Sequence, residues 1–238
     1  MGKKPRRNGA GWNKDKAQGQ KRHFTLDETI KLATHLQRTR QWHDLALLTV
    51  GLDTMLRASD LLKLTVADVT YSTGAIRTEL HLQQRKTRTT VQPTLTVSTK
   101  KKVARWIEQS GKTRRDYLFT RFKPPSAAPI CHKHLVSLVK GWAVWLGHPP
   151  DDYAAHSLRR SKAIALYRAG APIAELSEAL GHKTQASTML YLGITQERVR
   201  RVMLSLDMTS GFAGHLDWGE NAQKTLPEQP LSGIISRL

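Results

Sequence analysis

Most of the residues that could take part in catalysis are basic side chains spaced along the chain, and a tyrosine follows them. Attack on a phosphodiester needs a nucleophile, positive donors for the non-bridging oxygens and a proton donor for the leaving oxygen. Arginine suits the second task, because its planar fork donates two parallel hydrogen bonds to a phosphate and keeps its charge. Stabilising the charge of a transition state is usually the largest catalytic contribution. The candidates for these tasks are Arg57, Lys86, His156, Arg159, His182 and Tyr191.

The elements that must hold these candidates are expected to be mainly helical. The segment 25–28 has the Thr-x-x-Glu spacing of a capping box and predicts the start of a helix that runs to about residue 38. A second helix over about 42–54 is apolar nearly all round, as in a helix buried at the centre of a domain. Arg57 is therefore expected to emerge from a buried element.

Alternating and β-branched residues predict one β-hairpin, with strands at 76–82 and 91–97 and Lys86 at or near its tip. Apolar spacing predicts two further helices, which end at Gly111 and Gly147. The predicted fold class is thus mainly α with a small antiparallel hairpin.

Two of the candidates should lie at or near helix ends. Pro172 is tolerated in a first helical turn, and Gly181 should end that helix just before His182. His156 and Arg159 stand three residues apart, on one helical face or at a helix start.

Five fragments, taken together, resemble the motifs of the tyrosine recombinase (phage integrase) family. Each fragment alone is weak, but all five occur in the family's order and on the expected elements. They are 55–62 (MLRASDLL) around Arg57, Lys86 in the hairpin, 156–161 (HSLRRS), 180–183 (LGHK), and Tyr191 nine residues after His182.

The resemblance implies a nucleophile and its proton partners. Tyr191 would attack the scissile phosphate and leave a 3′-phosphotyrosine and a free 5′-hydroxyl. His156 is the nearest candidate to accept the phenol proton, and Lys86 would protonate the departing 5′-oxygen. Lys86 has rivals, since Arg85 and Arg88 belong to the same turn.

The resemblance also implies a set of phosphate contacts. Arg57 and Arg159 would hold the phosphate oxygens, and His182 would donate a hydrogen bond to the phosphate. Asp60 would orient Arg57 and its loop without touching the substrate. Arg160 and Lys183 are expected to bind DNA backbone or solvent, and no cofactor or metal is implied. The plain alternatives are a surface Arg57, a solvated face for His156 and Arg159, and a core aromatic at Tyr191.

The net charge points to a polyanionic partner. The chain of 238 residues has 38 lysines and arginines against 19 acidic residues, a formal charge of +19. Double-stranded DNA is the leading partner and a membrane surface is the rival. The longest apolar stretch, 45–56, is about 12 residues and contains Asp53, too short to span a bilayer. The one cysteine, Cys131, and the lack of a signal peptide favour a cytoplasmic, nucleoid-associated protein.

Three segments are expected. Residues 1–23, with eight Lys or Arg, should be a disordered basic arm that lies along DNA or simply aids solubility. Residues 24–208 should form the catalytic domain, and 209–238 a loose tail. The family's usual helical clamping domain is replaced here by the arm, and in size the chain is similar to fimbrial-switch invertases. An apolar stripe over 195–206 would be exchanged between neighbouring subunits or fold back on its own domain.

Three functions remain open from the sequence. The first is a site-specific recombinase that acts as a homotetramer on two DNA sites, with possible DNA-bending accessory proteins. The second is a topoisomerase-like nicking and closing enzyme, and the third is a DNA-binding regulator without catalysis. Two possible metal sites lack a supporting ligand cluster and are not expected to bind metal: Cys131 with His132 and His134, and Asp151 with Asp152.

Overall fold

The computed structural model describes residues 20–120, 128–194 and 196–205. Most of the expected arm, all of the expected tail, Leu206 and the side chain of Val202 lie outside the described residues. The elements in chain order are α1 (Leu26–Arg38), α2 (Trp42–Thr54), α3 (Ala58–Leu61), α4 (Val66–Val69), β1 (Leu82–Gln83), β2 (Thr90–Val91), α5 (Val97–Ser110), α6 (His132–Trp145), the 3-10 helix η1 (Pro150–Asp152), α7 (His156–Arg168), α8 (Ile173–Leu180), α9 (Gln185–Leu192) and α10 (Gln196–Leu204).

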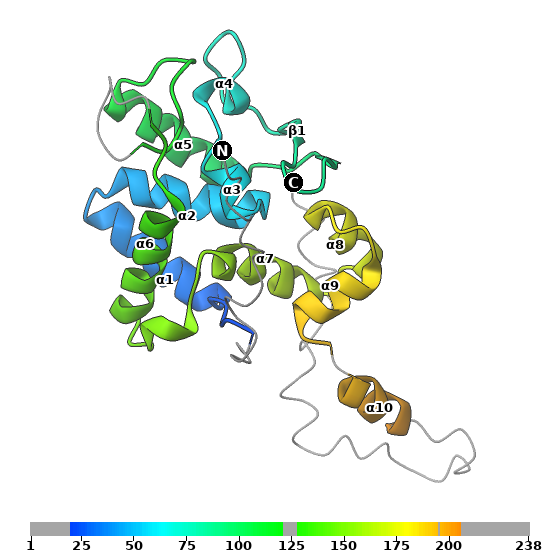
Figure 1. The fold of residues 1–238 in the computed structure, drawn as a ribbon. Coiled ribbons are helices and arrows are strands. Elements are labelled where there is room, and N and C mark those ends of the chain that lie inside the picture. The colour runs from blue at the N-terminus through cyan, green and yellow to red at the C-terminus, as the bar shows by residue number, and fades with distance from the viewer. Residues whose placement is uncertain (1–19, 121–127, 195, 206–238) are drawn as a thin grey trace, which may run out of the picture.

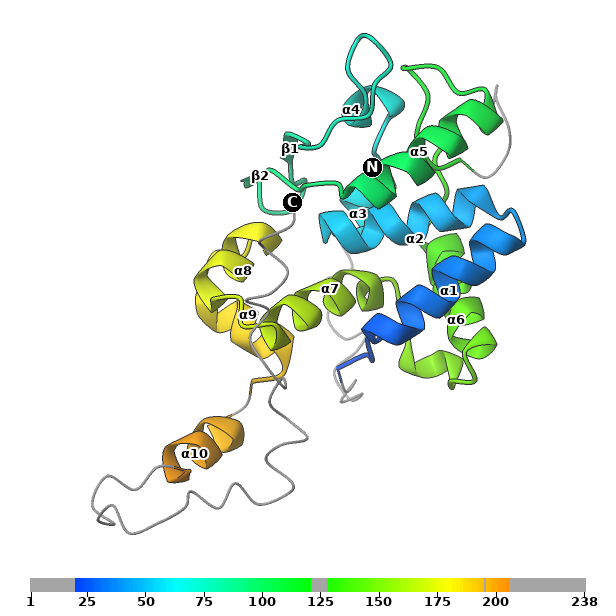
Figure 2. The ribbon, with the colours of Figure 1, turned by 180° about the vertical axis from the view of Figure 1, so that it is seen from behind.

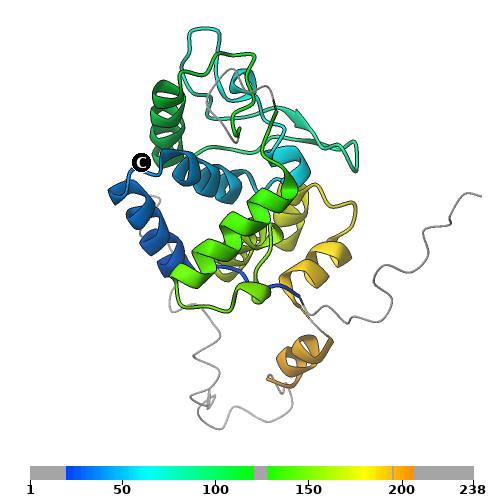
Figure 3. The same ribbon diagram turned by 60° about the vertical axis from the view of Figure 1, so that its left-hand side comes forward.

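Helix α2 lies at the centre of the larger part of the molecule. It packs against α1, α5 and α7, and α6 runs obliquely across the same body (Figures 1 and 3). Residues 45–50 of α2 are all buried, as expected of a helix that is apolar nearly all round. The apolar residues of this body, from Phe24 to Leu158, form one continuous cluster, which we call the main core.

Helices α8 and α9 form a second, smaller body. They pack against each other and against α7, and they stand to one side of the main core (Figures 1 and 2). Helix α7 joins the two bodies, since Leu158 belongs to the main core and Ile164 to the smaller cluster. We call that cluster the satellite cluster; its buried members are Met55, Ala163, Ile164, Leu176, Leu180 and Leu192.

The hairpin forms, but its strands are shorter than expected. Leu82 pairs with Val91 and Gln83 with Thr90 in antiparallel register. Beyond these pairs the two arms continue through an isolated bridge between Glu79 and Thr94. The second strand was predicted over 91–97, but in the structure it covers only Thr90–Val91. Val97 is the first residue of α5, because the Thr96 side chain accepts the Thr99 N–H and caps that helix.

The expected helix ends are confirmed where capping residues marked them. Thr25 and Glu28 form the reciprocal capping box at the start of α1. Gly111 is the C-cap of α5, and Gly147 comes directly after Leu146, the C-cap of α6; both glycines are at positive φ. No helix among the described residues is long and apolar enough to cross a membrane.

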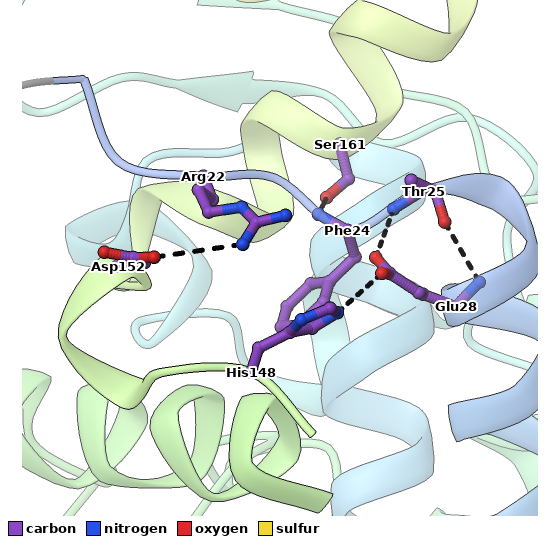
Figure 4. A network of polar contacts seen from close by, with 7 residues as sticks. All are labelled: Arg22, Phe24, Thr25, Glu28, His148, Asp152 and Ser161. Atoms are coloured by element: carbon purple, nitrogen blue, oxygen red, sulfur yellow. Dashed lines mark hydrogen bonds and ion pairs between the residues drawn. The ribbon is translucent and has the colours of Figure 1, made fainter. Parts of the chain in front are cut away.

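Residues 20–24, which we call the entry segment, bind the body of the molecule ahead of α1 (Figure 4). The Phe24 N–H donates to Ser161 Oγ at 2.9 Å, and the Arg22 N–H donates to the Asp152 carbonyl at 2.8 Å. The Phe24 ring is buried and stacks on Tyr153 with centroids 4.7 Å apart. The entry segment is therefore held by both main-chain bonds and an apolar anchor.

An ion pair ties the start of α1 to the loop after α6. His148 Nε2 lies 2.6 Å from Glu28 Oε1, and each side chain is about one-fifth exposed (Figure 4). Its hydrogen bonds to Thr25 and His148 lower the pKa of Glu28, although partial burial acts in the opposite direction. Glu28 thus serves the capping box and a long-range contact together.

Candidate functional site

Arg57 stands where the chain turns out of the main core. Helix α2 ends at Met55 in the left-handed conformation (φ 46°), and Arg57 is the N-cap residue of α3. Its side chain is partly buried, and Nη1 donates to Gln84 Oε1. The expectation that Arg57 emerges from a buried element is confirmed.

Arg159 is a buried cation, with 2% of its surface exposed. Its Nη1 donates to the Met55 carbonyl at 2.5 Å and its Nη2 to the Leu180 carbonyl at 2.6 Å. Within the described part of the chain no carboxylate forms an ion pair with it. Burial lowers the pKa of Arg159 to about 10, which leaves it charged at neutral pH. A buried charge with neutral partners is costly, so the site favours an incoming anion.

His182 follows Gly181, the left-handed C-cap of α8, as predicted. Its Nε2 lies 3.2 Å from Arg159 Nη2, and its Nδ1 lies 2.9 Å from Thr188 Oγ1. Arginine can only donate, so Nε2 is the acceptor and Nδ1 carries the proton. Burial, with Arg159 and Arg57 nearby, lowers the pKa of His182 to about 4. The imidazole is therefore neutral at pH 7 in this structure.

Tyr191 lies on α9 with its ring packed against the satellite cluster. Its ring meets His182 edge-on at 5.4 Å, and the Arg159 guanidinium carbon is 5.8 Å from its centroid. The phenol oxygen is buried, and the Arg159 guanidinium lies close enough to favour its ionised form. Burial raises the pKa of Tyr191, while Arg159, Arg160 and Arg57 act to lower it. The structure thus places the tyrosine beside both Arg159 and His182.

His156 and Lys86 lie farther out. His156 is the exposed first residue of α7, and its pKa is lowered by desolvation and then by Arg159, His132, Arg57 and Lys86. Several basic side chains of the candidate site therefore lie near His156.

Lys86 is exposed in the turn between β1 and β2, as predicted. It makes no hydrogen bond or ion pair with the described residues. We call residues 84–89 the lysine turn.

Asp60 and Gln84 hold the lysine turn. Asp60 Oδ1 accepts the Arg85 N–H at 3.2 Å, while its buried Oδ2 has no partner among the described residues. Asp60 therefore contacts the lysine turn through its side chain, and its N–H donates to the Arg57 carbonyl at 2.9 Å. Gln84 is the site residue that the sequence did not reveal, since it carries no motif signal and its contacts are long-range. Its Nε2 donates to the Leu180 carbonyl at 3.2 Å.

Arg160 binds the entry segment. Its Nη1 donates to the Lys21 carbonyl, and its Nη2 donates to Gln20 Oε1 at 2.6 Å. Gln20 Nε2 in turn donates to the carbonyls of Leu190 and Tyr191, at 3.0 and 2.6 Å. The carboxyl end of the tyrosine helix is thus linked to the entry segment. This contact was not predicted from the sequence.

The two metal-site alternatives gain no support. The described residues contain no group of three or more His, Cys, Asp or Glu placed to hold a metal ion. Cys131 is an exposed free thiol at the N-cap of α6. Asp151 instead pairs with Lys140 at 2.5 Å.

The domain is mainly helical and holds a buried arginine, Arg159, beside Tyr191. Arg159 forms no ion pair with a described carboxylate, so the arrangement suits a protein that brings an anion to the phenol. Residues 22–198 match the Phage integrase family over most of the chain. The protein belongs to this family, whose members are tyrosine recombinases.

Known proteins support the same assignment. Recombinase cre of Escherichia phage P1 is 25% identical over 185 residues, which cover 70% of this chain and 54% of the relative. The chain thus spans about half the length of that curated relative.

The fold is similar to the catalytic domains of solved recombinases. XerA recombinase matches with a TM-score of 0.58 at 17% identity, over 76% of this chain and 64% of that one. XerH site-specific recombinase, bound to palindromic difH substrate in a post-cleavage complex, matches with a TM-score of 0.61 at 18% identity, over 80% and 55%. The fold class expected from the sequence is confirmed.

Proposed function

We propose that this protein is a site-specific DNA recombinase that cleaves and rejoins DNA through a 3′-phosphotyrosine bond at Tyr191. The observation that carries the proposal is the position of the Tyr191 phenol. It is buried beside Arg159, a charged side chain whose partners are two neutral carbonyls and His182. A phosphate supplies the negative charge that this arrangement lacks.

The arginines account for phosphate activation without a metal or nucleotide cofactor. Arg57 and Arg159 present several N–H donors that no carboxylate neutralises among the described residues. Charge-assisted bonds from such donors strengthen as negative charge develops on the phosphate oxygens. In other phosphoryl-transfer sites a divalent cation performs this task.

The bond changes follow from the candidate roles. The Tyr191 oxygen attacks phosphorus, a tyrosine–phosphate bond forms, and the bond from phosphorus to the 5′-oxygen breaks. Because burial raises the pKa of Tyr191, its proton must pass to a base, and His156 is the candidate. Lys86 supplies a proton to the departing 5′-oxygen. Attack by another 5′-hydroxyl reverses these steps and rejoins DNA.

His182 is proposed as a phosphate contact whose protonation changes on binding. In the free protein its Nε2 accepts from Arg159. The negative charge of a nearby phosphate would offset the positive charges of Arg159 and Arg57. The pKa of the His182 imidazole would therefore rise. A protonated His182 then donates from Nε2 to a phosphate oxygen.

Assembly on DNA completes the proposal. We propose double-stranded DNA as the substrate, residues 24–208 as the catalytic domain and a homotetramer in the synapse. Structures of XerH with difH and of the Tn1549 transposon integrase with transposon end DNA show DNA bound by proteins of this fold. Helix α10 stands apart from the other helices (Figure 2), and Met203 and Leu204 on it are 72% and 73% exposed. These apolar side chains suit a contact between subunits.

The test is covalent trapping. The full chain is incubated with nicked suicide duplexes tiled across the DNA that flanks its coding sequence, and SDS-resistant adducts are sought. We expect an adduct with the wild-type protein and with Tyr71→Phe, a control at an exposed tyrosine on the main body. Tyr191→Phe should bind the same duplex and form no adduct.

The other outcomes decide between the alternatives. Tight binding to a duplex without any adduct would favour a DNA-binding regulator and overturn the proposal. An adduct that persists in Tyr191→Phe would remove Tyr191 from the mechanism. Relaxation of a supercoiled plasmid without strand exchange would favour a nicking and closing enzyme.

A further inference from the structure

Gln84 is a buried polar residue whose main chain belongs to the lysine turn. It is 1% exposed and directly follows β1. Its N–H donates to the Thr89 carbonyl at 2.9 Å, and its own carbonyl accepts the Arg88 N–H at 2.8 Å. Any displacement of the Gln84 main chain therefore moves the turn that carries Lys86.

The Gln84 side chain leaves the turn and enters the arginine site. Its Oε1 accepts from Arg57 and, at 3.0 Å, from Thr87 Oγ1. Its Nε2 donates to the Leu180 carbonyl at 3.2 Å. The orientation of the amide is fixed by chemistry, because a guanidinium can only donate and a carbonyl can only accept.

The Leu180 carbonyl is shared by two donors. Arg159 Nη2 binds it at 2.6 Å and Gln84 Nε2 binds it at 3.2 Å. Through this oxygen and Arg57, one amide joins both arginines and the end of α8, two residues before His182. Loss of one of these hydrogen bonds would leave a buried polar group without a partner, which lowers the stability of the fold.

Gly181 provides the space that the amide occupies. A Cβ at this position would lie 2.7 Å from both Nε2 and Oε1 of Gln84. Gly181 also has a φ of 60°, so its backbone conformation and its lack of a side chain both fit the close approach. The fit indicates a specific contact between the turn and the helix end.

We propose that Gln84 is a positioning residue that couples the lysine turn to the two arginines, so that Lys86 and the arginines address the same phosphate. The inference rests on the proposed function and names a residue outside its motifs. Arg57 has five N–H donors and keeps this contact through Nη1 while its other donors face a phosphate. Loss of the amide frees the turn and the Arg57 fork together.

The test compares Gln84→Met with two matched variants. Methionine keeps most of the side-chain volume and removes the hydrogen bonds. Gln92→Met makes the same replacement at an exposed residue directly after β2, and Lys86→Ala removes the proposed proton donor directly. Each variant is assayed in single-turnover cleavage on the trapped duplex with a normal phosphate and with a sulfur at the 5′-bridging position.

The sulfur substrate separates coupling from general damage. A thiolate leaves without protonation, since thiols ionise near pH 8.5, far below alcohols. The ratio of the two rates is taken within each variant, so it does not depend on the fraction of protein that is folded. On normal DNA we expect Gln84→Met to cleave about 10- to 100-fold more slowly, the scale of a misplaced catalytic group.

The expected result is that sulfur restores much of the loss in Gln84→Met, as in Lys86→Ala, and changes Gln92→Met no more than wild type. An equal loss on both substrates would show that Gln84 does not act through Lys86, and would overturn the inference while the proposed function stands. A rate equal to that of Gln92→Met would also overturn it.

A second measurement does not depend on cleavage. Hydrogen exchange should become faster in residues 85–90 of Gln84→Met, and remain unchanged there in Gln92→Met. If exchange in the turn is unaffected, the coupling does not exist, whatever the enzyme does. If wild type forms no adduct on any duplex but the turn loosens as expected, the contact stands and the proposed function fails.

Discussion

The main core and the satellite cluster hold different parts of the same site. Among the described residues the main core has 29 buried members and the satellite cluster has six. Arg57 lies between α2 and α3 of the main core, whereas His182 follows α8 and Tyr191 lies on α9. Segments with few buried contacts open at lower free energy than the whole domain. Arg57, the proposed phosphate contact, is thus held more firmly than Tyr191, the proposed nucleophile.

The test with the largest expected effect replaces one buried leucine in each region by alanine. Leu48 and Leu180 are both fully buried, and Leu→Ala at such sites costs about 2–5 kcal/mol. We expect Leu48→Ala to lower the free energy of global unfolding and to speed hydrogen exchange throughout. Leu180→Ala should speed exchange over 173–192 and leave α2 protected. Equal loss of protection in α2 with both variants would show that the two regions unfold as one.

The pH dependence of stability gives a second test, with an expected effect of intermediate size. The pKa of His182 is lowered to about 4 from 6.5, so the unfolded state binds more protons between these values. Stability from this group is present above pH 6.5 and is lost as the pH falls towards 4. The pKa of His23 in the entry segment is also lowered to about 4, chiefly by burial.

The two histidines should act on different regions. Exchange, corrected for its intrinsic pH dependence, should rise in α8 and α9 between pH 7 and pH 5. His182→Gln should reduce this rise, and His23→Gln should leave it and instead reduce the rise around residues 20–25. A pH response of α8 and α9 that survives His182→Gln would assign it to another group.

The smallest test uses two threonine caps. Thr25 Oγ1 accepts the Glu28 N–H at the start of α1, and Thr184 Oγ1 accepts the Ser187 N–H at the start of α9. Replacing such a cap by alanine costs about 1 kcal/mol. Thr25→Ala should lower the melting temperature with normal cleavage. Thr184→Ala should slow cleavage a few-fold with little change in melting temperature, and the reverse pattern would contradict the division of roles.

The sequence revealed the parts of the fold that local chemistry determines. The capping box at Thr25, the apolar surface of α2 and the glycine at 181 each act within a turn or two of their own helix. Gly181 alone was enough to place His182 at a helix end. The ordered spacing of the motif residues then predicted a common site, and the structure brings Arg57, Arg159, His182 and Tyr191 together there.

Contacts between distant segments were not predictable in this way. Gln84 meets Leu180 across 96 positions, and Gln20 meets Tyr191 across 171. From the local sequence pattern alone, either glutamine could equally be a solvated surface residue. The hairpin shows a local competition instead: Thr96 and Val97 alternate like strand residues, but the Thr96 hydroxyl caps α5 and ends the strand.

The contact of the entry segment with α9 has a topological consequence. Gln20 binds the Leu190 and Tyr191 carbonyls and lies against Gly193, so the start of the described unit touches the far end of α9. Joining these points by a short linker and opening the chain in the exposed turn at 71–74 would give a circular permutant with the same packing. The order of the candidate catalytic residues along the chain would change, while their arrangement in space would not.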